Sequence, residues 1–155
     1  MVSVLFVCIA NSCRSPAAEG ILRHLAQKEG LELHVESCGV GDWNIGDLPN
    51  EKMREATKSR GIILSSRAKK IRPSYLDSFD FILAADKSVI NELYRYAVTP
   101  EHRNKIHLIT HFSSVYPDQP IPDPYYGGEA GFENVLDMIE DACHGFIKHI
   151  KGQKN

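Results

Sequence analysis

Residues 2–16 read Val2-Ser3-Val4-Leu5-Phe6-Val7-Cys8-Ile9-Ala10-Asn11-Ser12-Cys13-Arg14-Ser15-Pro16, and they constrain the architecture more tightly than any other segment. The apolar run Val2–Val7 is typical of a strand buried within a parallel sheet. Serine is a preferred helix N-cap and proline suits the first turn, so we predict that a helix begins at Ser15-Pro16. A strand that leads through a polar loop into a helix is a unit of an α/β fold.

Strand and helix patterns alternate along the rest of the chain. Further strands are predicted at Leu31–Val35, Phe79–Ala84 and Ile106–Thr110. Further helices are predicted at Glu51–Arg60, from the N-cap Asp86 to about Tyr96, and over the apolar stripe Phe132–Ile150. We therefore expect one α/β domain over residues 1–155. It should be doubly wound, with a four-stranded parallel sheet of flavodoxin-like order 2-1-3-4 and helices on both faces. In such folds, ligands bind beyond the carboxyl ends of the strands, where Cys8 lies.

Composition and charge exclude several classes of protein. The chain has 155 residues, of which 43% are hydrophobic and 25% charged, with a formal net charge of −2. These values are typical of a folded domain without the excess of positive charge that attracts polyanions, so no nucleic-acid partner is expected. No apolar stretch approaches the ~20 residues of a membrane helix, and the first residues lack the basic start of a secretory signal. We expect a cytoplasmic protein with no membrane partner and mostly reduced thiols.

The loop after the first strand places Cys8 and Arg14 with five residues between them, and we call residues 8–15 the cradle. Backbone N–H groups in such a loop, with the positive end of the following helix, favour a dianion such as phosphate. Arg14 can hold two phosphate oxygens, and the same field favours the thiolate form of Cys8. That thiolate could attack phosphorus to form a cysteinyl-phosphate, with Ser15 as a hydrogen-bond donor to the sulfur.

A cysteine and an arginine at this spacing form a weak pattern by themselves. A cysteine that ends a buried strand is usually a small core residue. A zinc site would need two more ligands than Cys8 and Cys13 supply. The order of strand, loop, arginine, Ser-Pro and amphipathic helix favours the phosphate-binding interpretation.

A candidate general acid lies in the proline-rich segment before the last helix, at Asp123-Pro124-Tyr125-Tyr126-Gly127. Proline disfavours helix at the residue before it, so Asp123 could project over the cradle. There, its carboxyl group could protonate the leaving oxygen and later accept a proton from water. The two tyrosines could provide apolar walls for an aromatic leaving group. Taken alone, the segment fits better a Pro-Gly-rich turn that Asp123 caps, with the tyrosines packed on the surface.

Together, the segments V-C-x-x-N-x-C-R-S-P and D-P-Y-Y-G resemble those of the low molecular weight protein tyrosine phosphatases over nearly the whole chain. The resemblance implies that Cys8 is the nucleophile, Arg14 the phosphate clamp and Asp123 the general acid and base. It also implies that Asn11 holds the cradle in a left-handed conformation and that Ser15 supports the thiolate.

The resemblance assigns further residues to the site. Ser37 matches a serine of the supporting hydrogen-bond network, and Cys13 a cysteine that can form a reversible disulfide with the nucleophile. The substrate-binding set that it implies is Ile9, Ala10, Asn11, Ser12, Cys13, Ser15, Trp43, Tyr125 and Tyr126, with the last three at the mouth of the site. No metal or cofactor is implied.

Three positions depart from the family pattern. Ala10 replaces a usual glycine, and its methyl group could tighten or shift the cradle. Ser12 stands where tyrosine phosphatases often have isoleucine and related arginine phosphatases have threonine. Ser66 replaces a histidine that bonds to the loop asparagine, so weaker or water-mediated support of Asn11 is expected.

We expect a phosphatase that hydrolyses phosphotyrosine in proteins and small aryl phosphates, releases inorganic phosphate, and exists as a monomer or weak dimer. Ser12 motivates the alternative of a protein-arginine phosphatase. An arsenate reductase of the same fold would relay oxidation through downstream cysteines, and no cysteine lies between Cys38 and Cys143. A phosphoprotein-binding module without activity is a fourth hypothesis, and the complete set of Cys8, Arg14 and Asp123 argues against it.

Overall fold

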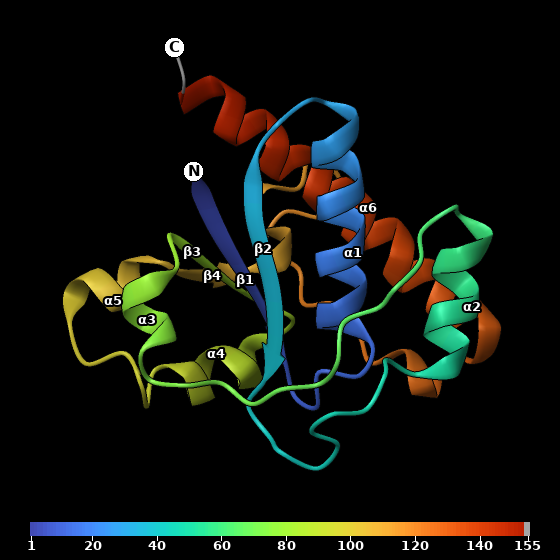
Figure 1. Cartoon of the computed structure of the whole chain (residues 1–155), viewed down its shortest axis with the longest axis horizontal. Coiled ribbons are helices and arrows are strands. Elements are labelled where there is room, and N and C mark those ends of the chain that lie inside the picture. Colours follow the sequence, from blue (N-terminus) through green and yellow to red (C-terminus); the bar gives the residue numbers. More distant parts are fainter. Residues whose placement is uncertain (154–155) are drawn as a thin grey trace.

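Four parallel strands form the centre of the molecule in the order β2-β1-β3-β4 (Figure 1). The computed structural model describes residues 1–153, without the side chains of Tyr126, Glu129 and Gln153. The strands are β1 (Val2–Cys8), β2 (Leu33–Gly39), β3 (Phe81–Ala84) and β4 (Ile106–Leu108). The predicted fold class and strand order are confirmed.

Helices cover both faces of this sheet. On one face lie α1 (Arg14–Lys28) and α6 (Gly128–Gln153), and α2 (Glu51–Ser59) packs against α6. On the other face lie the short helices α3 (Tyr75–Ser78), α4 (Lys87–Leu93) and α5 (Pro100–Asn104), as Figure 1 shows. Side chains of β1 alternate between the two cores: Val4 and Phe6 pack toward α1 and α6, whereas Leu5 and Val7 pack toward α3 and α4. A strand buried on both faces reads as a continuous apolar run, as Val2–Val7 does.

The sheet register places the strand ends together. Cys8 pairs with Gly39 at the end of β2, and Val7 with Ala84 at the end of β3. The loops that follow β1, β2 and β3 therefore meet at one edge. Two 3₁₀ turns complete this edge: η1 (Ile109–Phe112) after β4 and η2 (Pro124–Tyr126) before α6.

Several predicted boundaries are wrong, for local reasons. The first helix begins at Arg14, and Ser15 is not its N-cap, because the Ser15 hydroxyl is bonded to Cys8 instead. The second strand begins and ends later than predicted, at Leu33–Gly39. The fourth strand ends at Leu108, where the chain turns into η1. Helices α3 and α5 were not predicted, since four or five residues are too few to show a helical period.

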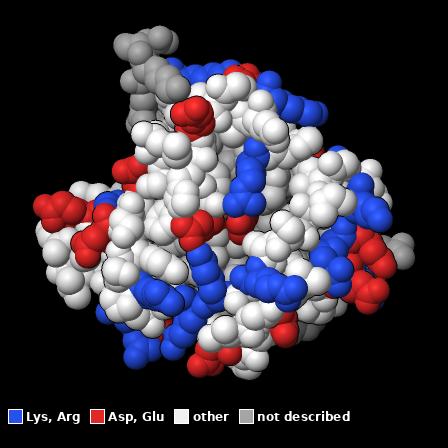
Figure 2. Space-filling model, in the orientation of Figure 1, with Lys and Arg blue, Asp and Glu red and all other residues white. Residues whose placement is uncertain are grey.

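No helix among residues 1–153 is long and apolar enough to cross a membrane. The surface carries charges of both signs, and Lys and Arg side chains gather over the lower part of the face in Figure 2, where residues 61–74 run in Figure 1. That segment contains Arg67, Lys69, Lys70 and Arg72. Lys69 pairs with Glu36, and Arg67 donates to the Gly46 carbonyl, so two of these cations are held by the chain itself.

Candidate active site

The cradle joins the last residue of β1 to the first residue of α1 around a small cavity of about 120 Å³. Asn11 has a φ of 54°, a left-handed conformation that asparagine tolerates better than most residues. This conformation turns the chain within five residues from the strand end to the helix start. The cavity is lined by Cys8, Ile9, Ala10, Ser12, Cys13, Arg14, Asp123 and Tyr125. The fold thus brings the predicted aspartate, which lies far along the sequence, to the same cavity as the predicted cysteine and arginine.

A backbone donor fixes the direction of the hydrogen bonds beneath the cradle. The N–H of Lys69 donates to Asn11 Oδ1 at 3.0 Å. Because a backbone N–H can only donate, the other end of the amide, Nδ2, must face Ser15 Oγ at 2.8 Å and Ser37 Oγ at 3.0 Å. Asn11 is 3% exposed and its amide is fully paired. Direct support for Asn11 thus comes from the backbone N–H of Lys69.

Ser15 links these hydrogen bonds of fixed direction to the Cys8 sulfur. Its oxygen accepts from Asn11 Nδ2 and lies 2.9 Å from Cys8 Sγ. Its own proton is therefore available to Cys8 when that cysteine is a thiolate. The second acceptor within reach, the Cys38 carbonyl, is farther away at 3.3 Å. Hydrogen bonding to the charged form stabilises that form, so the network favours the nucleophilic state of Cys8.

The network ends at a carboxylate that the sequence analysis did not single out. Ser37 Oγ donates to Glu19, which is 5% exposed and is paired on its other oxygen with Arg23. A buried carboxylate needs such partners. The available signal was the spacing: Glu19 lies four residues after Ser15, on the same face of α1.

Arg14 is held from behind by two acceptors. Its Nη1 donates to Asp86 Oδ2 at 2.7 Å and to the Ile121 carbonyl at 2.9 Å. Both contacts use one nitrogen, and the guanidinium also lines the cavity. A guanidinium fixed in this way can hold phosphate oxygens without further ordering.

Asp86 has two roles, of which the sequence indicated one. It caps α4 as predicted, because its Oδ1 accepts from the N–H of Val89 at 3.0 Å. Its other oxygen is the partner of Arg14. Burial raises the pKa of Asp86, but hydrogen bonds from Ser88, Arg14 and the backbone more than offset this and hold the pKa below its usual range. Asp86 thus stays ionised beside Arg14 at neutral pH.

Asp123 reaches the cavity from the segment before α6. Proline at 124 keeps it extended, with a ψ of 121°, and its Oδ1 accepts from the N–H of Tyr125 at 3.0 Å. Just before it, the N–H of Ile121 donates to the Ala85 carbonyl at 2.8 Å. The segment is therefore tied to the end of β3, and Asp123 lines the same cavity as Cys8.

Cys13 lies in the cavity wall as a thiol. Burial raises its pKa to about 11, although a hydrogen bond with the Tyr125 hydroxyl acts in the opposite direction. Cys13 is therefore protonated near neutral pH. All four cysteines are free and buried.

The mouth of the site differs in part from the expected set. Tyr125 lines the cavity, but Trp43 does not: it is 72% exposed and its ring packs over Gly41. The side chain of Tyr126 lies outside the described part of the structure. Ala10 lines the cavity as expected of a cradle residue. Among the side chains that the structure describes, no group of three or more His, Cys, Asp or Glu residues could hold a metal ion.

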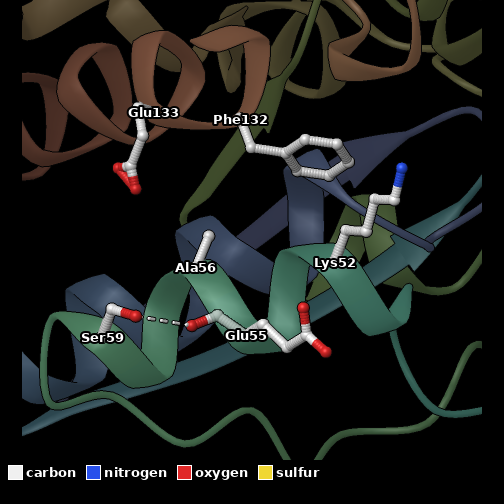
Figure 3. A pocket seen from close by; sticks show the side chains of 6 residues that line it. All are labelled: Lys52, Glu55, Ala56, Ser59, Phe132 and Glu133. Carbon is white, nitrogen blue, oxygen red and sulfur yellow. Dashed lines mark hydrogen bonds between the residues drawn. The ribbon is translucent and has the colours of Figure 1, made fainter. Parts of the chain in front are cut away.

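A larger hollow of about 270 Å³ lies between α2 and α6 (Figure 3). Its floor is apolar, with Ala56 and Phe132, and its rim carries Lys52, Glu55, Ser59 and Glu133. Ser59 Oγ donates to the backbone carbonyl of Glu55, as the dashed line in Figure 3 marks. The lining offers no cysteine nucleophile and no arginine, so the chemistry expected from the sequence belongs to the smaller cavity.

The comparisons agree with this geometry. The family model described as low molecular weight phosphotyrosine protein phosphatase matches residues 3–155. A putative low molecular weight protein-tyrosine-phosphatase of Synechocystis is 38% identical over 146 residues, covering 93% of each chain. A protein tyrosine phosphatase structure from Entamoeba histolytica has a TM-score of 0.93 and 34% identity, covering 100% of both chains. A Drosophila arginine phosphatase structure has a TM-score of 0.88 and 36% identity, covering 96% of this chain and 97% of that one.

The match to the family model spans almost the entire chain, and both segments that carry the resemblance meet at one cavity. This chain therefore belongs to the low molecular weight phosphotyrosine protein phosphatase family.

Proposed function

We propose that this protein is a cysteine-dependent phosphatase that hydrolyses phosphotyrosine in proteins through a cysteinyl-phosphate at Cys8. The observation that carries the proposal is the position of Cys8. Its sulfur lies 2.9 Å from a hydroxyl whose proton is available to it, in a cavity that Arg14 and Asp123 also line. The proposed nucleophile, the phosphate-binding arginine and the proposed general acid thus line the same cavity.

In the first step, the Cys8 thiolate attacks phosphorus, and the sulfur–phosphorus bond forms as the bond to the leaving oxygen breaks. The carboxyl group of Asp123 gives its proton to that oxygen, so tyrosine leaves as the phenol. Arg14 and the cradle N–H groups hold the remaining phosphate oxygens, where charge accumulates in the transition state. Because Arg14 is fixed by Asp86 and Ile121, this stabilisation requires no rearrangement.

In the second step, the Asp123 carboxylate accepts a proton from water as the water oxygen attacks phosphorus. The sulfur–phosphorus bond breaks, inorganic phosphate is the product, and Cys8 leaves as the thiolate. The Ser15 proton stabilises the departing sulfur at 2.9 Å. The chemistry needs no metal or cofactor.

The Tyr125 side chain, in the cavity wall, supports an aromatic leaving group. A protein-arginine phosphatase is the second candidate, supported by Ser12 in the cavity wall and by the similarity to the Drosophila arginine phosphatase. Neither Cys38 nor Cys143 is among the residues that line the cavity with Cys8, which gives no support to an arsenate reductase that relays oxidation through downstream cysteines.

A rate comparison tests the proposal. Peptides carrying phosphotyrosine, phosphoserine or phosphoarginine are supplied to the wild type and to Cys8→Ser. We expect the highest kcat/KM on phosphotyrosine and no turnover by Cys8→Ser. A preference for phosphoarginine that Ser12→Ile reverses would favour the second candidate, and normal turnover by Cys8→Ser would overturn the mechanism.

We further propose that residues 1–155 act as a single phosphatase domain in the cytoplasm, as a monomer or weak dimer, on phosphotyrosine-containing protein substrates and without nucleic-acid or membrane partners. The free state of all four cysteines supports a reducing compartment. Sedimentation at several protein concentrations tests the oligomeric state, and a stable dimer at the lowest concentration would contradict it.

A further inference from the structure

Besides the backbone bond that its carbonyl accepts from Arg54, Asn50 makes three hydrogen bonds, to the cradle, to α2 and to Tyr125. Its backbone N–H donates to the Ser12 carbonyl in the cradle at 2.9 Å. Its Oδ1 accepts from the N–H of Met53 at 3.0 Å, which caps α2. Its Nδ2 donates to the Tyr125 hydroxyl at 2.9 Å, across a gap of 75 residues in the sequence. Figure 1 shows the start of α2 beside the segment that leads into α6.

The orientation of this amide is fixed. The Met53 N–H can only donate, so it must face Oδ1, and Nδ2 must face Tyr125. The Tyr125 oxygen therefore accepts from Asn50, and its own proton is available to another partner. Tyr125 and Cys13 both line the cavity. The tyrosine hydroxyl is thus held by the N-cap residue of α2.

Packing alone does not hold the Tyr125 ring, because 58% of the residue is exposed. On the other side of Asp123, the segment is fixed to β3 through Ile121. On the Tyr125 side, the side-chain bond to Asn50 ties the segment to the opposite wall. The segment that carries Asp123 and Tyr125 is therefore fixed at two points, through Ile121 on one side and through Asn50 on the other.

We propose that Asn50 is a positioning residue that, through the Tyr125 hydroxyl, holds the aromatic wall and Asp123 over the cradle and so favours aryl leaving groups. This inference rests on the proposed phosphatase activity. It assigns a specificity role to a residue outside the cavity lining, which sequence patterns mark only as a helix cap.

The test uses two variants that separate this role from capping. Asn50→Ser keeps a good N-cap oxygen but is too short to reach Tyr125. Tyr125→Phe keeps the ring and removes the hydroxyl. We expect each variant to lower kcat/KM on a phosphotyrosine peptide about fivefold, the effect of losing about one net hydrogen bond. We expect the double variant to lose no more than either single one, because both remove the same contact.

Further measurements distinguish positioning from general damage. Inhibition by inorganic phosphate, which needs only the cradle, is expected to be unchanged in both variants. Asn50→Asp, whose carboxylate can accept the Tyr125 proton, is expected to recover most of the lost rate. Thr99→Ser, at the cap of the distant α5, is the control for a cap exchange and is expected to behave as wild type.

Wild-type kcat/KM in Asn50→Ser, a multiplied loss in the double variant, or an Asn50→Asp rate equal to that of Asn50→Ser would overturn the inference while leaving the phosphatase function intact. A wild type that is inactive on every aryl phosphate would instead overturn the proposed function.

Discussion

At Ser15, the hydroxyl oxygen accepts from Asn11, so its proton can be given to Cys8 once that cysteine is a thiolate. The direction of these hydrogen bonds is fixed by the backbone N–H of Lys69, which can only donate. A main-chain donor more than fifty residues away in the sequence thus sets the direction of the hydrogen bonds around Cys8. Such a fixed direction costs no reorganisation during the reaction.

Asp123 is expected to act as a general acid on the leaving oxygen. Asp123→Asn should slow the first-turnover release of a poor leaving group, such as phenol, on the order of a hundredfold. Release of a good leaving group, such as 4-nitrophenol, should slow far less, because it leaves without a proton.

Rapid-mixing measurement of leaving-group release checks this difference. Asp118→Asn is the matched control in the same proline-rich segment, because Asp118 pairs with His111 away from the cavity. Equal slowing of both leaving groups in Asp123→Asn would argue against acid catalysis by this residue.

The depressed pKa of Asp86 predicts a pH-dependent contribution to stability. A carboxylate whose pKa is lower in the folded state stabilises the fold above its unfolded pKa, and the contribution is lost as pH falls through the folded value. Asn is also a good N-cap, so Asp86→Asn removes mainly the charge beside Arg14.

The wild type should therefore be more stable than Asp86→Asn from neutral pH to about pH 4, with the difference shrinking below that. Urea unfolding in phosphate-free buffers measures it, since phosphate would bind Arg14. A difference in unfolding free energy that stays constant through the acid range would contradict the assignment.

At the scale of elements, the end of β2 supports the cradle from the side. A Cβ added at Gly39 would lie 2.7 Å from the Ile9 carbonyl oxygen and 2.9 Å from Asn11 N, both backbone atoms. Glycine is required there by this close approach, and the β1–β2 register places it beside Cys8.

Gly39→Ala should therefore displace the cradle and lower kcat/KM about tenfold or more, with weaker inhibition by phosphate. Gly152→Ala, where an added Cβ meets nothing within 4 Å, is the control. Unchanged kinetics in Gly39→Ala would show that the cradle does not depend on this contact.

Local sequence patterns predicted the elements that are long enough to show a regular apolar pattern. The apolar run before Cys8 and the stripe of the last helix were both identified, because each depends on neighbours in the sequence. The contacts of Arg14 with Asp86 and of Asn50 with Tyr125 span 72 and 75 residues, and no local pattern encodes them. Ser15 looked like a cap because its type fits one, and the nearby sulfur took the hydroxyl instead.

At the scale of the whole molecule, Arg60 ties α2 to the long helix α6. Its guanidinium pairs with Glu133, Asp137 and Glu140, which lie on successive turns. These partners are partly exposed, so the pairs contribute modestly and weaken with salt. The contact stabilises the layer of helices on one face without touching the cavity.

Arg60→Ala should lower the free energy of unfolding by about 1 kcal/mol at low salt, and less at high salt, with turnover unchanged. Urea titration at two salt concentrations measures this. Arg95→Ala, which removes one exposed pair with Glu92, should have a smaller effect. An equal loss in both variants would show that the three pairs do not act as a network.

Placement of a residue by family resemblance succeeds where the backbone constrains it and fails where it does not. Asn11 has the left-handed conformation that the resemblance implies. Trp43, on a loop between β2 and α2, packs over Gly41 and lies outside the cavity wall. The cradle is surrounded by three strand ends, whereas Trp43 is mostly exposed to solvent.

The central claim is that Cys8 becomes phosphorylated during turnover, and trapping that species tests it most directly. Wild-type protein is quenched with acid within the first turnovers of an aryl phosphate, digested and mapped by mass spectrometry. We expect a phosphoryl group on the sulfur of Cys8 and none in Cys8→Ser, which should still bind inorganic phosphate. A phosphoryl group on another residue, or continued turnover by Cys8→Ser, would contradict the account.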